Sequence, residues 1–183
     1  MANGIEGLDK LMKKYGQLAE QVAEQAMERA VGASCKMVQG EARLLCPVFQ
    51  GGGGGELRQS IMTSVEKVDA MTTGTIYTNK AYAPYVEFGT GPKGEQSHAG
   101  ISPVVTPSYT QSPWWIHESQ VDEAAAEAYH WHYIDTPDGR FYQSAGQAAQ
   151  PFMYPALKNN EERATRNISN YLAREIKKVC ESC

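Results

Sequence analysis

Four histidines are the side chains that could most readily hold a metal ion or move protons: His98, His117, His130 and His132. Together with Glu87 or Glu118 they would offer the ligands and the base of a metal-assisted hydrolase. Their spacing argues against that chemistry, because His130 and His132 flank Trp131 as on a strand and lack the i, i+4 spacing of a helical zinc pair. No HExxH sequence and no recognisable Ser or Cys nucleophile motif accompanies them. We therefore predict solvated or hydrogen-bonded histidines, and keep the hydrolase as an alternative that stoichiometric zinc would reveal.

Two further motifs resemble ligand sites only in part. Cys180 and Cys183 have the CxxC spacing of half a zinc site, but Cys35 and Cys46 do not form the second pair that such a site needs. The glycine run at 51–55 is followed by Glu-Leu-Arg and lacks the Lys-Ser/Thr that binds phosphate and magnesium in a P-loop. We predict free thiols and no catalytic residue, cofactor or metal ion, and leave metal binding by the CxxC pair open.

The most constrained backbone is predicted for residues 78–94, TNKAYAPYVEFGTGPKG. Aromatic residues stand there beside glycines and prolines, a pattern typical of a short apolar element that ends in a tight turn. We expect Val86 and Phe88 to be core residues and the turn to face a partner. Glu87 lies between apolar neighbours, so its carboxylate must reach water or a hydrogen-bond donor. This position favours a capping or turn role for Glu87 over catalysis.

Two long amphipathic helices are predicted near the ends of the sequence. From Ile5 to Leu45 the chain has no proline and apolar residues recur every three or four positions, which predicts a helix of about 60 Å. Small residues along its apolar stripe would let another backbone approach closely, in the same subunit or in a neighbouring one. A second stripe from Leu157 to Val179 predicts a C-terminal helix with Arg and Lys opposite its apolar face.

Strands and a long excursion are predicted between the helices. Residues 56–68 read as a strand or a strand pair, and residues 72–79 read as a further strand rich in β-branched and aromatic residues. Residues 92–146 hold five prolines, three tryptophans and all four histidines, and are too long for a plain loop. Within them VDEAAAEAYHW favours a short helix, and Asp138-Gly139 predicts the turn of a two-stranded hairpin. We expect the tip of this excursion to touch a partner.

These elements predict an α+β fold in a single domain spanning residues 1–183. A long N-terminal helical segment covers 1–46. A small antiparallel β-sheet covers 47–157, with the long loop or hairpin excursion at 92–146. The C-terminal helix, at 155–180, is expected to pack on one face of the sheet.

The charge of the chain is unevenly distributed. The formal net charge is −4, but residues 47–155 carry five basic and eleven acidic side chains, whereas residues 156–183 carry six and four. A sequence-reading nucleic-acid protein would show a basic patch, so we do not predict that class. No segment approaches the roughly 18 apolar residues of a membrane span, and the N-terminal residues lack the apolar core of a signal peptide. We expect a soluble protein that stays in the cytoplasm where it is made.

Three segments, in this order, resemble the signature of the gene-product-ten neck or tail-completion proteins of long-tailed phages. They are PVFQGGGGGELRQSI at 47–61, AYAPYVEFGTG at 81–91 and QPFMYPAL at 150–157. We call them the first, middle and last family-like segments; the middle one is the most specific. The chain departs from the family pattern where Gln50 replaces Thr and five glycines replace one, and residues from about 121 to 131 look inserted.

The resemblance implies a structural virion protein of the phage neck or tail top, which joins the head connector to the tail and completes the tail. The implied partners are copies of itself in a ring, head-closure or connector proteins, and a tail terminator or tail tube protein, with a DNA channel adjacent. It implies no enzyme, no membrane and no sequence-specific DNA binding. The implied location is the head-tail junction of the virion, and the host cytoplasm during assembly. A transient tail-assembly factor absent from the virion is the alternative.

The subunit or partner interface is expected around the turn, the tryptophan pair and the segment before the C-terminal helix. Its predicted residues are Tyr82, Pro84, Tyr85, Glu87, Phe88, Gly89, Thr90, Gly91, Trp114, Trp115, Gln150, Pro151 and Phe152. Rings use heterologous contacts, so this set on one subunit would meet a different surface on the next. The acidic middle of the chain is our choice for the surface that faces the channel.

Overall fold

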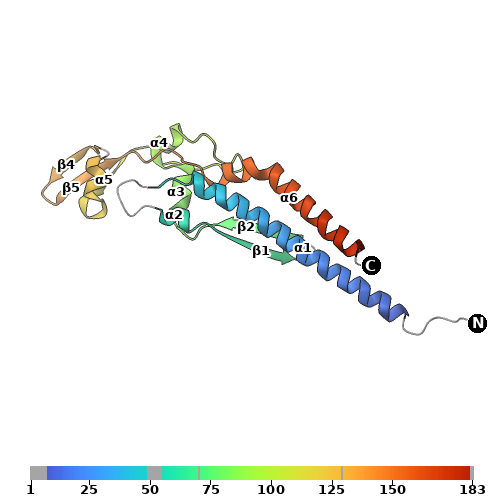
Figure 1. The fold of residues 1–183 in the computed structure, drawn as a ribbon. Coiled ribbons are helices and arrows are strands. Elements are labelled where there is room, and N and C mark those ends of the chain that lie inside the picture. Colours follow the sequence, from blue (N-terminus) through green and yellow to red (C-terminus); the bar gives the residue numbers. More distant parts are fainter. Residues whose placement is uncertain (1–7, 49–54, 70, 129, 182–183) are drawn as a thin grey trace, which may run out of the picture. The chain divides into compact units, whose positions relative to one another are not determined.

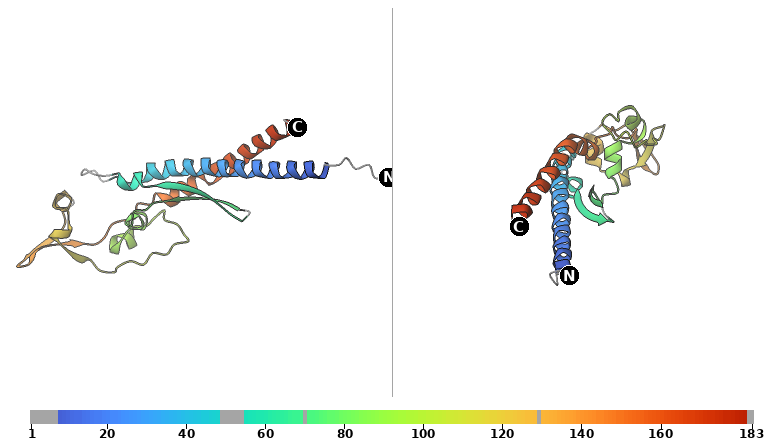
Figure 2. Two further views of the ribbon diagram at one scale, coloured as in Figure 1. Left: turned by 90° about the horizontal axis from the view of Figure 1, so that it is seen from below. Right: turned by 90° about the vertical axis from the view of Figure 1, so that its right-hand side faces the viewer.

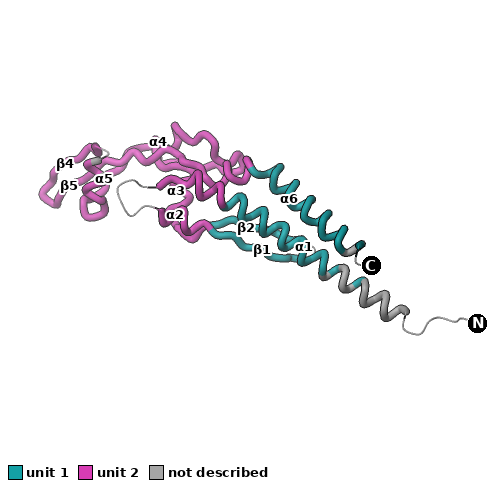
Figure 3. Tube along the Cα trace, viewed as in Figure 1, with its two compact units in different colours: residues 1–39, 62–77, 160–183 teal, residues 40–61, 78–159 magenta. Residues whose placement is uncertain are grey.

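The computed structural model describes residues 8–48, 55–69, 71–128 and 130–181. The chain divides into two compact units, each built from separated stretches of sequence (Figure 3). Unit 1 combines residues 1–39, 62–77 and 160–183, and unit 2 combines residues 40–61 and 78–159. The predictions made for Gln50, most of the glycine run and Cys183 lie outside the described residues.

Unit 1 places a β-hairpin beside a long helix. Helix α1 (Leu8–Leu45) confirms the predicted N-terminal helix. Strands β1 (Met62–Val68) and β2 (Met71–Tyr77) pair antiparallel, with Met62 opposite Tyr77, and lie alongside α1 (Figures 1 and 2). This hairpin accounts for the two predicted strands.

The hairpin approaches α1 closely because β2 carries a glycine at the contact. A Cβ atom on Gly74 would lie 2.7 Å from Val31 Cγ1 and would also collide with the sulfur of Cys35. An exposed ion pair between Lys67 of β1 and Glu24 of α1 adds a second link. The alternation of half-buried and exposed residues along β2 fits a strand with one face on a helix.

Helix α6 (Met153–Glu181) confirms the predicted C-terminal helix and contacts α1 within unit 1. Ser34 Oγ of α1 donates a hydrogen bond to the carbonyl of Ala164 at 3.4 Å and accepts one from Asn167 Nδ2 at 3.2 Å. Ser34 and Ala30 are buried, and such small residues allow two helices to approach. Beyond this contact the C-terminal part of α6 diverges from α1 (Figure 2).

Short helices and turns make up the first part of unit 2. Helix α2 (Glu56–Gln59) occupies the first four residues that were predicted as a strand, so that part of the prediction is wrong. Glu, Leu, Arg and Gln all have high helix propensity, and the N–H of Ser60 donates to the Glu56 carbonyl at 2.9 Å, closing a helical turn. Extended backbone begins only at Met62.

A second antiparallel sheet, of strand order β3-β5-β4, lies within the predicted excursion. Strands β3 (Trp114–His117), β4 (Tyr133–Thr136) and β5 (Gly139–Ser144) form it, and η1 (Glu118–Gln120) and α5 (Glu123–Ala128) connect β3 to β4 (Figure 1). The predicted Asp-Gly hairpin and short helix are confirmed. The ribbon has three strands instead of two, because a tryptophan-rich segment that follows several prolines pairs with β5.

The largest fully buried side chains are Phe152, Ile61 and Cys46, all in unit 2. The predicted α+β class is confirmed, with a long N-terminal helix, small antiparallel sheets and a long C-terminal helix. None of the described helices combines the length and the apolar character that crossing a membrane would require.

Candidate interaction site

The middle family-like segment forms two short helices joined by a sharp turn. Helix α3 (Ala83–Phe88) and helix α4 (Gly91–Gln96) each carry a proline in the first turn, where the missing N–H has no intrahelical partner. Gly91 adopts a φ of 60°, and a Cβ atom there would lie 2.7 Å from a ring carbon of Trp114. Glycine is therefore required both by the turn and by the close approach of the tryptophan.

Glu87 of α3 caps the start of α6. Its Oε2 accepts hydrogen bonds from the N–H groups of Phe152 at 2.7 Å and Met153 at 2.9 Å, and its Oε1 accepts one from the N–H of Tyr154 at 3.0 Å. The first N–H groups of a helix lack intrahelical partners, and the positive end of the helix dipole favours an anion. Glu87 is only 6 % exposed, yet its charge is satisfied by these donors. The predicted capping role is confirmed.

Backbone hydrogen bonds tie the same turn to the chain that precedes α6. The N–H of Thr90 donates to the Gln147 carbonyl at 2.9 Å, and the N–H of Gln147 donates to the Thr90 carbonyl at 3.1 Å. Gln147 Nε2 donates to the Tyr85 carbonyl at 2.8 Å, and the N–H of Gln150 donates to the Val86 carbonyl, also at 2.8 Å. The middle and last family-like segments are thus held side by side.

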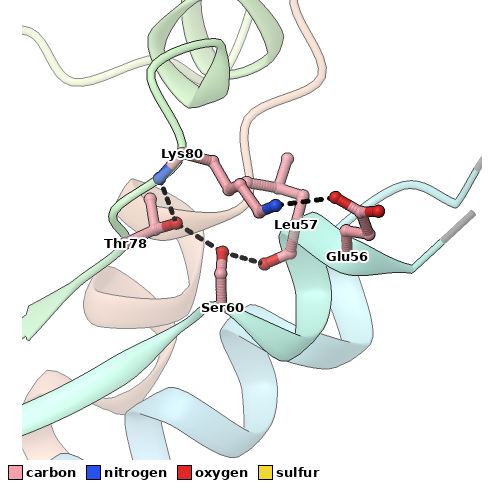
Figure 4. Close-up of polar contacts among 5 residues, drawn as sticks. All are labelled: Glu56, Leu57, Ser60, Thr78 and Lys80. Carbon is pink, nitrogen blue, oxygen red and sulfur yellow. Dashed lines mark hydrogen bonds and ion pairs between the residues drawn. The ribbon is translucent and has the colours of Figure 1, made fainter.

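The first family-like segment joins this arrangement through a polar cluster (Figure 4). Lys80 Nζ lies 2.6 Å from Glu56 Oε2, and the hydroxyl oxygens of Ser60 and Thr78 lie 2.5 Å apart. The hydrogen bond lowers the pKa of Glu56 and raises the pKa of Lys80. Ser60 Oγ also donates to the Leu57 carbonyl at 2.8 Å, which fixes the end of α2.

Two arginines strengthen the same region by donating to main-chain carbonyls. Arg43 Nη2 donates to Ile61 at 2.7 Å, and Arg58 Nη2 donates to Cys46 at 2.8 Å. Burial raises the pKa of the Cys46 thiol; the charge of Arg58 opposes that rise and the charge of Glu87 adds to it. Residues of the first and middle family-like segments therefore share one electrostatic environment.

An apolar groove of about 510 Å³ opens beside the turn. It is lined by Pro84, Tyr85, Phe88, Gly89, Thr90, Gly91, Pro107, Ser108, Tyr109, Thr110 and Trp114. Tyr109 Oη donates to the Phe88 carbonyl at 2.8 Å, and desolvation raises the pKa of Tyr109. This hydrogen bond holds the wall formed by residues 107–110 against α3. At the rim Tyr85 is 60 % exposed, so a large aromatic side chain faces solvent next to the groove.

One face of the β3-β5-β4 sheet presents a second apolar surface. The strand registers place Trp115, His117, Ile134 and Phe141 on the same face. Trp115 and Ile134 are about 40 % exposed, and the ring of His132 lies 5.9 Å from that of Trp115 between centroids. We call these five residues the sheet surface.

The predicted interface residues divide by burial. Glu87, Gly89, Gly91 and Phe152 are buried, so they support the site from inside. Tyr82, Pro84, Tyr85, Trp115 and Gln150 are exposed, and Phe88, Thr90, Trp114 and Pro151 are half-buried. Val86 and Phe88, expected in the core, are likewise half-buried.

Sequence reasoning missed the second wall of the groove and part of the sheet surface. Residues 107–110 lie in a proline-containing stretch without periodicity, and Tyr109 was the only large side chain there that could have drawn attention. Ile134 and Phe141 flank the Asp-Gly turn that was predicted. Their side of the sheet could have been deduced from the two-residue alternation of a hairpin.

Two of the histidines make ordinary hydrogen bonds, as predicted. His117 Nδ1 lies 2.8 Å from Ser119 Oγ and its Nε2 lies 3.0 Å from the Asp138 carbonyl, and His98 Nδ1 lies 3.1 Å from the Gly94 carbonyl. Among the described residues no three His, Cys, Asp or Glu side chains are grouped so that they could hold a metal ion.

Comparison with known proteins gives one family match. Residues 9–89 match the family model HK97-gp10-like, described as "Bacteriophage HK97-gp10, putative tail-component". The matched range includes the first family-like segment and most of the middle one, so the resemblance seen in the sequence is confirmed there. The match supports a structural role as a bacteriophage tail component. No curated protein and no solved structure matched the chain.

Proposed function

We propose that the chain is a structural subunit of the phage neck or tail top that joins the head connector to the tail and completes the tail. The family match over residues 9–89 supports a tail component, and a tail component is a part of the virion. Position at the head-tail junction, assembly into a ring and the identity of the neighbours are our extension of that match.

The observation that carries the proposal is the apolar groove with its aromatic rim. The middle family-like segment lines it together with residues 107–110 and Trp114, and Tyr85 at its rim is 60 % exposed, while Tyr82, nearby in the sequence, is 43 % exposed. Buried capping by Glu87 and the Thr90–Gln147 pairing hold the groove in shape, so little ordering is needed when a partner binds. Rigid aromatic side chains of this kind dominate the binding energy of many protein interfaces.

The first experiment is size-exclusion chromatography with light scattering, on the purified chain alone and then with the adjacent connector protein and the tail terminator. A closed ring, or a stoichiometric complex with either protein, is the expected result. A chain that stays monomeric in every mixture would contradict a structural neck role.

Mass spectrometry of purified virions distinguishes a structural subunit from a transient assembly factor. A structural subunit remains in the finished particle at a fixed ratio to the tail tube protein, whereas a factor does not. The hydrolase alternative predicts stoichiometric zinc in the purified protein, which we do not expect.

A further inference from the structure

The exposed side of α6 carries a concentration of positive charge. Residues 163–178 contain five basic side chains and one acidic side chain. At about 100° per residue, Arg163, Arg166, Arg174 and Lys177 fall within an arc of about 80° on the helix. All four are exposed, and we call them the basic face.

The basic face forms few ion pairs with other described residues, although Glu162 lines a shallow hollow beside Arg166. Arg163 and Arg166 form no ion pair with another described residue, and Arg174 Nε donates to the Asn170 carbonyl of its own helix at 3.2 Å. Lys177 pairs with Glu181, at 3.6 Å and in an exposed position where such pairs contribute little. The contact of α6 with α1 uses other positions, Ala164 and Asn167.

The β3-β5-β4 sheet and its connections carry the opposite charge. Residues 114–144, which we call the acidic module, contain six acidic side chains and one basic one. The one basic side chain, Arg140, is paired with Asp135 at 2.8 Å. Glu118, Glu123, Glu127 and Asp138 are exposed. The carboxylate of Glu118 in η1 lies beside Gly139, which follows Asp138 in the β4–β5 turn. Two negative charges, those of Glu118 and Asp138, therefore lie in the same part of the module.

We propose that the acidic module of one copy docks on the basic face of α6 of the next copy. The inference rests on the proposed function, because it presupposes that copies of the chain associate. Both surfaces are charged, exposed and of opposite sign, and such complementarity orients partners and accelerates their encounter. Because the two surfaces differ, the contact is heterologous and repeats from copy to copy, as a ring requires.

The module also contains all of the residues that look inserted relative to the family pattern, at about 121–131. The family match ends before the module, at residue 89. The contact would therefore be particular to this chain. Nucleic acid is the competing partner for the basic face. We favour a second copy, because the acidic module of that copy complements the basic face, whereas the same module would repel DNA.

Two triple variants test the contact. The helix variant carries Arg163→Glu, Arg166→Glu and Arg174→Glu, and the module variant carries Glu118→Lys, Glu123→Lys and Glu127→Lys. Each variant alone places like charges at the contact, and we expect self-association, measured by light scattering and sedimentation, to weaken by at least about tenfold. Both variants should melt as the wild type does, because all six side chains are exposed. A control with Glu28→Lys and Lys36→Glu reverses exposed charges on α1 and should associate normally.

An equimolar mixture of the two variants gives the sharpest result. The basic module of one variant then faces the acidic helix of the other, and the acidic module of the second faces the basic helix of the first. We expect the mixture to recover association with strictly alternating composition, and to lose it as salt is raised.

Other outcomes overturn the proposal. Recovery only when both sets of changes are in one chain, and never in the mixture, would mean that the contact lies within a copy. A helix variant that assembles normally but no longer binds a duplex DNA probe would assign the basic face to nucleic acid. Variants that assemble as the wild type does would refute the contact while leaving the proposed function standing. A wild-type chain that never associates would refute both.

Discussion

Glu87 connects two segments that are 65 residues apart, and it does so with main-chain partners only. Its three hydrogen bonds satisfy N–H groups at the start of α6 that would otherwise lack partners in a buried place. The apolar neighbours of Glu87 in the sequence keep water away and make the bonds strong. A carboxylate inside the Tyr-Val-Glu-Phe-Gly sequence is thus a structural requirement of the fold.

Replacing Glu87 should destabilise unit 2 more than any change on its surface. Glu87→Ala leaves three N–H groups without acceptors, and we expect a loss of about 2–4 kcal/mol in the free energy of unfolding. Glu87→Gln keeps one acceptor oxygen and should cost about half as much. Urea denaturation followed by circular dichroism measures both. A Glu87→Ala protein with an unchanged midpoint would show that the cap contributes nothing.

The buried thiols give a prediction on pH. Burial raises the pKa of Cys35 and of Cys46 above the ordinary value, so the folded chain keeps these protons to higher pH than the unfolded chain, which releases them near about pH 8.5. The stabilisation is complete below that pH and is lost as pH rises toward the folded pKa values.

Thiol labelling tests this in a Cys180→Ser/Cys183→Ser protein, which retains only the two buried cysteines. Labelling should be slow at pH 7 until denaturant is added, and the unfolding midpoint should fall between pH 8 and pH 10. A matched protein that also carries Cys35→Ala and Cys46→Ala should lose most of that fall. Rapid labelling of the native protein at pH 7 would contradict the buried placement.

At the scale of elements, the contact between α1 and the β1–β2 hairpin depends on the absence of a side chain at Gly74. Gly74→Ala would place a methyl group 2.7 Å from Val31 Cγ1 and against the Cys35 sulfur. We expect a cost of about 1–3 kcal/mol from overpacking. In a Cys35→Ala background the same change should cost less, because the sulfur is gone, and a double-mutant cycle measures the difference. If the destabilisation by Gly74→Ala is the same with and without the Cys35 sulfur, the strain does not come from that contact.

The sequence predicted the elements with strong local signals and missed those set by distant contacts. The apolar stripes of α1 and α6, the Asp-Gly turn between β4 and β5 and the alanine run of α5 all carry their own pattern. The helical turn at α2 was misread because four residues are too few to show a period. The pairing of Thr90 with Gln147 has no local signature at all.

The candidate site was likewise predicted only in part. The Tyr-Val-Glu-Phe-Gly-Thr-Gly sequence predicted a constrained turn, and seven of the predicted interface residues line one groove. The second wall at 107–110 could not be found, because a hydroxyl-to-carbonyl bond from Tyr109 to Phe88 brings it there across 21 residues. Phe152, which was predicted among the interface residues, is fully buried, and a phenylalanine beside a helix start is well suited to a core.

At the scale of the whole molecule, four exposed surfaces stand out: the groove with its tyrosine rim, the sheet surface around Trp115, the acidic module in which that sheet lies, and the basic face of α6. The first two are apolar and the last two are charged, so they suit different partners. The neck subunit that we propose would have to meet its own copies and the proteins above and below it. Apolar surfaces supply affinity in such contacts, and charged surfaces supply orientation.

Truncating the exposed aromatics should therefore affect assembly more than folding. Tyr85→Ala and Trp115→Ala remove side chains that are 60 % and 42 % exposed, so each should change the free energy of unfolding by less than about 1 kcal/mol. We expect each change to weaken binding to other copies or to the connector by about tenfold or more, because aromatic side chains often anchor an interface. Tyr77→Ala, an exposed tyrosine on β2 of unit 1, is the matched control and should assemble normally. A Tyr85→Ala chain that melts as the wild type does and still forms normal assemblies would remove the groove rim from the interface, and the sheet surface would then have to provide the apolar contact by itself.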